Sequence, residues 1–163
     1  MFFLERDDWM RQPAQRRSRA CLRPEISRTK TFGKIGVSNG LFFEKHLKYI
    51  HLNQEFYNFT QHDLSYLMRD SYDQAMAKEL AEVPIVNVRD LPALATSQDP
   101  PKAVKVIYKS KSDFKGAVKI LGIMDDSKSG VPRMAYKGVV PTFYRGIRVH
   151  LSPGLNWRGY PSS

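Results

Sequence analysis

A first amphipathic stretch lies near the middle of the chain. Phe43, Leu47 and Ile50 recur at positions i, i+4 and i+7, which is the spacing of one helix face. Ser38 precedes this run and is a suitable N-cap residue, because its hydroxyl can accept from the exposed N–H groups of a first turn. The pattern predicts a helix over residues 41–52.

A second amphipathic stretch follows a short segment rich in aromatic residues. Thr60 and Asp63 have the spacing of a capping box, with Asp in place of the usual Glu or Gln. Pro84 ends the run, so the pattern predicts a helix over residues 61–82. The apolar stripe of this helix consists of Leu64, Leu67, Met68, Tyr72, Ala75 and Met76. Two neighbouring helices joined by a short connection indicate an α-helical hairpin.

Short runs of β-branched residues replace the helical pattern after Pro84. Residues 103–107 and 117–121 have similar sequences, which would let them pair as a β-hairpin. From residue 131 onward, frequent Pro and Gly leave no room for long regular elements. We therefore expect an extended C-terminal region that is studded with aromatic side chains.

The first 37 residues have no sustained period, and their prolines interrupt the short runs that begin. The chain accordingly divides into a basic extended arm (1–37), an acidic helical hairpin (38–83) and a basic Pro/Gly-rich region with short strands (84–163). The predicted fold is mainly irregular and extended, with a central α-helical hairpin and room for a short β-hairpin. It is not a compact globular domain.

Charge is distributed unevenly along the chain. Nine basic and four acidic residues give +5 over 1–37, four basic and seven acidic give −3 over 38–83, and thirteen basic and five acidic give +8 over 84–163. Two basic arms around an acidic centre favour an extended anionic partner. Because the apolar residues of the arms are scattered, we expect them to be buried against that partner rather than in a core of their own.

Composition excludes several classes of protein. The chain is 42% apolar and 12% aromatic, which is too rich for a purely disordered tail. Its one cysteine, Cys21, cannot form an intrachain disulfide, so a reducing compartment is expected. There is no apolar run of about 18 residues that would span a membrane. Acidic residues interrupt the apolar N-terminus before it becomes a signal-peptide core.

The residues that would carry catalysis are not arranged for it. His46, His51, His62 and His150 lack metal-ligand spacing, and no pair of cysteines assists them. No Gly-x-Ser-x-Gly motif is present. Asp125 and Asp126 form a tight carboxylate pair, but the Ser, Lys and Gly residues after them indicate a solvated turn. The sequence predicts a non-enzymatic protein with no cofactor, no metal and no small-molecule substrate.

Basic residues interleaved with aromatic ones are the remaining candidates for function. Arginine pairs with carboxylates or phosphates, and large aromatic side chains anchor interfaces or stack on bases. A solvated basic surface is the simpler explanation of the same residues. The predicted partner-binding residues are Trp9, Arg16, Arg17, Arg19, Arg23, Tyr144, Arg145, Arg148, Trp157, Arg158 and Tyr160.

The arginine-rich arm, the run from Thr31 to His46 and the proline-punctuated basic tail together resemble myofilin, a small thick-filament protein of insect muscle. The resemblance implies a structural muscle protein that binds along myosin coiled-coil rods, in the cytoplasm within the thick filament of the sarcomere. The charge pattern is compatible, because coiled coils of this kind expose acidic bands.

Two other classes fit the same composition. An RNA-binding accessory protein of a ribosome or mitoribosome would also be small, basic and extended, although no recognised RNA-binding module is present. A microtubule-associated strap would bind an acidic surface in the same way. No membrane partner is expected.

Overall fold

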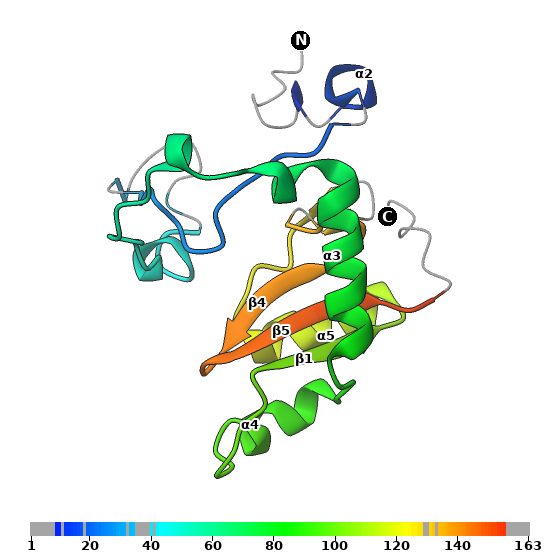
Figure 1. Cartoon of the computed structure of the whole chain (residues 1–163). Helices are drawn as coiled ribbons and strands as arrows, with labels where there is room; N and C mark the ends of the chain where they lie inside the picture. The colour runs from blue at the N-terminus through cyan, green and yellow to red at the C-terminus, as the bar shows by residue number, and fades with distance from the viewer. Residues whose placement is uncertain are drawn as a thin grey trace.

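A three-stranded mixed sheet lies at the centre of the structure (Figure 1). The computed structural model describes residues 9–10, 12–17, 19–31, 33–34, 40, 42–128, 131–132 and 134–155. The strand order is β1 (Ala103–Tyr108), β5 (Ile147–Pro153), β4 (Val140–Tyr144). β1 and β5 run parallel, whereas β4 and β5 run antiparallel.

The two faces of the sheet follow from alternation along the strands. Val104 pairs with Val149 and Val106 pairs with Leu151, and all four side chains are buried on one face. Lys105 lies opposite His150 and therefore faces the other side. One face is thus apolar, and the other carries polar side chains.

Helix α5 (Lys111–Leu121) covers the apolar face and makes the crossover that parallel strands require (Figure 1). Ser110 caps its N-terminus, because the hydroxyl accepts from the Asp113 N–H at 3.0 Å. Gly122 ends it in the left-handed conformation, with φ of 69°. The buried residues of α5 are Phe114, Ala117, Val118 and Leu121. They complete one hydrophobic core with β1, β4, β5 and Leu91.

Helix α3 (Arg69–Glu82) crosses the polar face of the sheet, opposite α5 (Figure 1). No residue of α3 is buried. Lys105 of β1 donates from Nζ to the carbonyl of Leu80, one of the last carbonyls of the helix. The segment after α3 runs beside β1, where Ile85 forms a parallel bridge with Lys105. α3 is therefore held by polar contacts and by its connection to the sheet.

The remaining elements are short. Helix α4 (Leu91–Leu94) follows a 3-10 turn at Val88–Asp90, and its Leu91 enters the core. Strands β2 (Ser127–Lys128) and β3 (Val131–Pro132) form a separate antiparallel pair. The part of the chain before α3, which we call the N-terminal segment, has α2 (Pro13–Arg16) and 3-10 turns at Leu47–Tyr49, Phe59–Gln61 and Ser65–Leu67.

The prediction of a mainly extended chain is wrong, because the sheet and α5 enclose a buried core. Residues 103–108 do form a strand, as expected. Residues 117–121 are helical rather than the second half of a hairpin, because the cap at Ser110 and the apolar period of α5 outweigh the local β-branched content. The proline-containing C-terminal region supplies β4 and the central strand β5.

The predicted α-helical hairpin is also absent from the described residues. In the first predicted helix, residues 42–46 are turns and Leu47–Tyr49 is a 3-10 turn, with no buried face to stabilise an α-helix. The second helix ends at Glu82, as Pro84 indicated, but begins at Arg69. Before this start, the Asp63 carboxylate accepts from the backbone and hydroxyl of Ser65 in a local turn, and Met68 is extended, with ψ of 141°. The division of the chain after residues 37 and 83 stays a prediction.

Candidate functional site

A cluster of charged side chains joins α3 to the polar face of the sheet. His150 Nε2 lies 3.0 Å from Glu79 Oε1, and Arg148 Nε lies 3.2 Å from the same oxygen. The Arg148 contact is an ion pair without hydrogen-bond geometry. Arg148 Nη1 also donates to Glu25 Oε2 at 2.9 Å. One arginine thus ties the N-terminal segment, α3 and β5 together.

A histidine oriented by a carboxylate is the arrangement of many general bases, but this one is closed. His150 is only 3% exposed, so a substrate cannot reach its ring. The Glu79 carboxylate is shared with Arg148, which neutralises it. The cluster therefore holds the N-terminal segment, α3 and β5 together.

A second polar cluster joins α3 to the turn before β4. The Tyr136 hydroxyl donates to Asp73 Oδ1 at 2.9 Å, and Lys137 Nζ donates to Asp73 Oδ2 at 2.6 Å. These hydrogen bonds, the one from Lys137 first, hold the pKa of Asp73 below its ordinary value of 3.8. The Asp73 carboxylate in turn raises the pKa of Lys137. The Tyr72 and Tyr136 rings meet edge to face at 5.6 Å.

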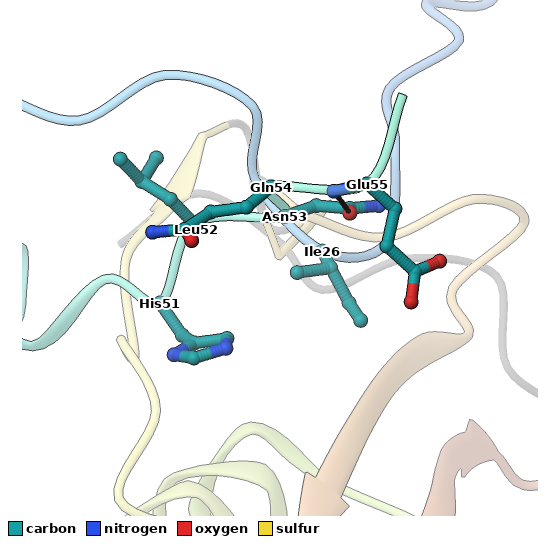
Figure 2. A pocket seen from close by; sticks show the side chains of 6 residues that line it. All are labelled: Ile26, His51, Leu52, Asn53, Gln54 and Glu55. Carbon is teal, nitrogen blue, oxygen red and sulfur yellow. Dashed lines mark hydrogen bonds between the residues drawn. The ribbon is translucent and has the colours of Figure 1, made fainter. Parts of the chain in front are cut away.

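A hollow with a volume of about 380 Å³ lies beside the extended part of the N-terminal segment. Two extended stretches of the chain meet there, because Ser27 forms a parallel bridge with Leu52 and the Asn53 N–H donates to the Ser27 carbonyl at 2.8 Å. The lining residues are Ile26, His51, Leu52, Asn53, Gln54 and Glu55. Figure 2 shows Ile26 between the His51 ring and the Glu55 side chain, with all three directed to the same side.

The chemistry of this hollow suits polar ligands. The imidazole of His51, the amide of Gln54 and the carboxylate of Glu55 are exposed and offer both donors and acceptors, while Ile26 adds an apolar patch. In the described residues no group of three His, Cys, Asp or Glu side chains is placed to hold a metal ion.

A nearby ion-pair cluster stabilises the turn that precedes the hollow. Glu44 contacts Lys34 at 2.8 Å and Lys48 at 2.7 Å. Hydrogen bonds from these two ammonium groups lower the pKa of Glu44 to about 2. All three groups are largely solvated, so we assign the cluster a local ordering role rather than a large share of stability.

The described members of the predicted contact set differ in exposure and in their contacts within the chain. Trp9 and the four arginines of the N-terminal segment are exposed, whereas Tyr144 packs against the core. Arg145 has φ of 48° and shares the tight β4–β5 turn with Gly146, at φ of 89°. Arg148 has its charge partners within the chain. The predicted residues Trp157, Arg158 and Tyr160 lie outside the described residues.

The polar residues that the structure brings together were missed in the sequence. Asp73 and Glu79 lie outside the predicted apolar stripe of their helix. His150 lacks metal-ligand spacing, and the sequence predicts no other role for it. The contacts Asp73–Tyr136 and Glu79–His150 join residues 63 and 71 positions apart, so no local signal reports them.

Comparison with known proteins gives the family. Residues 4–163 match the model of the GNT-I family, and the chain belongs to that family. It is 34% identical over 134 residues to an alpha-1,3-mannosyl-glycoprotein 2-beta-N-acetylglucosaminyltransferase of Arabidopsis thaliana. The alignment covers 82% of this chain and 30% of the relative, so the chain spans less than a third of the length of that curated protein.

These findings overturn the function expected from composition. The resemblance to myofilin is wrong, and so are the non-enzymatic structural role, the muscle thick-filament location and the myosin partner, because the family match points to a glycosyltransferase. The RNA-binding and microtubule alternatives have no support either. The net positive charge did not predict the family, because net charge indicates which partners a protein attracts and does not indicate its fold.

Part of the contact prediction is still open. The eleven residues remain a prediction as a contact set, without the filament as their partner.

No helix in the described part of the chain is long and apolar enough to cross a membrane.

Proposed function

We propose that this chain is part of a glycosyltransferase that moves N-acetylglucosamine from a sugar nucleotide to a mannose of a glycoprotein. The observation that carries the proposal is the match of the GNT-I family to residues 4–163, together with 34% identity to a named N-acetylglucosaminyltransferase. A glycoprotein substrate agrees with an enzyme of the Golgi.

The proposed reaction is a substitution at the anomeric carbon of the donor sugar. A mannose hydroxyl oxygen forms the new glycosidic bond as the bond from that carbon to the nucleotide diphosphate breaks. The hydroxyl proton passes to a base, and the diphosphate leaves with the electron pair and the negative charge. Groups that orient the two sugars and neutralise the leaving group would account for most of the rate.

The described residues contribute a scaffold to this reaction. The core of β1, β4, β5 and α5 fixes the polar face of the sheet, and Arg148 holds the N-terminal segment on that face through Glu25. We assign no catalytic role to His150, because its ring is closed to substrates.

The exposed arginines of the N-terminal segment fit the proposed donor. Arg16, Arg17, Arg19 and Arg23 lie within eight residues and are all exposed. Guanidinium groups bind phosphate oxygens with two hydrogen bonds, and a cluster of them raises the local concentration of an anionic substrate. We propose that this cluster attracts the sugar nucleotide.

A chimeric enzyme tests the function. The stretch of the Arabidopsis relative that aligns with this chain is replaced by this chain, and the purified chimera is assayed for transfer of N-acetylglucosamine to a mannose-terminated glycoprotein. We expect transfer well above background. The control is the Arabidopsis enzyme with the same stretch replaced by a Gly/Ser linker, which should be inactive.

A chimera that is folded and monodisperse but transfers no N-acetylglucosamine to any mannose-bearing acceptor would contradict the proposal. A second variant tests the arginines. Arg16→Gln together with Arg17→Gln should raise the KM for the sugar nucleotide with little change in kcat, because the cluster acts on binding.

A further inference from the structure

Large apolar side chains are exposed throughout the segment before α3. Phe56 is 90% exposed, Tyr49 is 69% exposed and Met68 is 67% exposed. Three further exposed aromatic residues lie in the same segment, and we call the exposed large side chains of residues 49–68 the aromatic surface: Tyr49, Phe56, Tyr57, Phe59, Tyr66 and Met68. This many exposed large apolar side chains within twenty residues indicate an interaction site.

Local contacts order part of this surface. Tyr57 stacks on His62 at 4.3 Å between ring centroids and meets Phe59 edge to face at 4.8 Å. The Arg28 guanidinium lies 5.5 Å from the centre of the Phe59 ring, and its Nη1 donates to the Glu55 carbonyl at 3.1 Å. The Phe59 ring is therefore held beside the hollow, because its partner Arg28 bonds to Glu55, which lines the hollow.

The segment does not satisfy its apolar residues within this chain. Among the described residues before Leu91 none is buried, although the segment is rich in Phe, Tyr and Leu. Each large aromatic side chain left in water forgoes about 1.5 to 3 kcal/mol of burial. A segment that buries so few of its apolar side chains against its own chain is suited to pack on another folded surface.

The length of the relative indicates what that surface is. The alignment covers 30% of the Arabidopsis protein, so more than two thirds of a family-length enzyme has no counterpart in this chain. A second copy of this chain is a poor occupant, because each copy carries a net charge of +10.

We propose that the aromatic surface docks on the portion of a family-length glycosyltransferase that this chain does not contain. The proposal rests on the proposed function in that the family supplies the missing portion. Phe56 is the central anchor, because it is the most exposed of the six residues and its neighbours line the hollow. The hollow receives a side chain of the facing surface.

Hydrogen exchange tests the docking without reference to activity. Amide exchange of residues 49–68 is compared between this chain alone and the chimera with the Arabidopsis enzyme. We expect exchange at least about tenfold slower in the chimera, because docking suppresses local opening. Equal exchange in the two proteins would overturn the proposal.

Two substitutions locate the surface. Phe56→Ser in the chimera should restore fast exchange over residues 49–68, whereas Phe143→Ser should leave it slow. Phe143 is the matched control, because it is an aromatic residue that is 49% exposed on β4 and is not one of the six residues of the aromatic surface. Equal effects of the two substitutions would show that the docking surface is wrongly placed.

A mixing experiment covers the case in which the chimera does not fold. This chain is mixed with a separate polypeptide made of the Arabidopsis sequence outside the alignment. Binding is measured for the parent chain and for the Phe56→Ser and Phe143→Ser variants separately. Binding that Phe56→Ser weakens at least about tenfold supports the proposal. Self-association of this chain through Phe56 with no binding of the second polypeptide overturns it. An inactive chimera with slow exchange would contradict the proposed function and leave the docking intact.

Discussion

The segments before and after Pro84 use similar apolar residues in opposite ways. After Pro84, Tyr108 and Leu151 are fully buried between the sheet and α5. Before it, Phe56 is almost fully exposed, and none of the described residues is buried. The two segments meet through polar contacts, such as those of Glu79 with Arg148 and His150. Apolar content alone therefore does not decide where a core forms; strand pairing across long sequence distances does.

Truncating the core should give the largest effect and the sharpest contrast between the segments. Leu151 is fully buried on the central strand, so Leu151→Ala should lower the free energy of unfolding by about 2 to 5 kcal/mol. Leu22 is 61% exposed, so Leu22→Ala should change it by less than about 0.5 kcal/mol. Urea denaturation followed by circular dichroism gives both values. Similar losses would mean that the N-terminal segment has a core of its own.

A buried hydrogen bond should come next in size. The Tyr108 hydroxyl donates to the Gly138 carbonyl at 2.5 Å in the core. Tyr108→Phe leaves that acceptor without its hydroxyl partner and should cost about 1 to 3 kcal/mol. Tyr66 is exposed in the other segment, and Tyr66→Phe should leave the urea midpoint unchanged. An unchanged midpoint for Tyr108→Phe as well would show that the carbonyl finds another donor.

The helix cap at Ser110 should have a smaller effect. Ser110→Ala removes the acceptor of the Asp113 N–H and should cost about 0.5 to 2 kcal/mol. Ser112 lies in the same helix and is exposed, so Ser112→Ala is the control and should be close to neutral. Thermal melts of the two variants are compared. A larger shift for Ser112→Ala would argue against the assigned start of α5.

The Asp73 cluster should give the smallest effect and one that depends on pH. The folded pKa of Asp73 is below 3.8, so its ion pair with Lys137 stabilises the fold above that pH. This contribution is lost as the pH falls from 3.8 toward the lower folded pKa. Asp73→Asn should therefore melt at a lower temperature than the parent at pH 7, and the difference should shrink below pH 4. A difference that is constant with pH would exclude the ion pair as its source.

Local patterns predicted some elements and misread others. The β-branched run after residue 102 correctly predicted a strand there, and Pro84 correctly predicted the end of α3, because both signals act within a few residues. Helix α5 could have been found from Ser110, Asp113 and the apolar spacing from Phe114 to Leu121. The β-branched residues within residues 117–121 gave a false strand signal. Similarly, β5 alternates apolar and polar residues, but nearby prolines and Gly146 masked the pattern.

The candidate site depended on information that one sequence does not hold locally. The contacts of Asp73 and Glu79 need the strand order β1-β5-β4 before they can be inferred. The hollow needs the pairing of Ser27 with Leu52, which is a single bridge between segments without periodicity. The charge distribution of the sequence carries no information about the reaction.

The central position of β5 has a consequence for synthesis of the protein. β1 and α5 are synthesised well before β5 (Ile147–Pro153). The edge of β1 that pairs with β5 therefore stays unpaired until β5 has left the ribosome. Until then the apolar face of β1 and α5 is open to other chains. We expect the nascent protein to depend on chaperones in this interval, and to fold in one late step when β5 is inserted between its two neighbours.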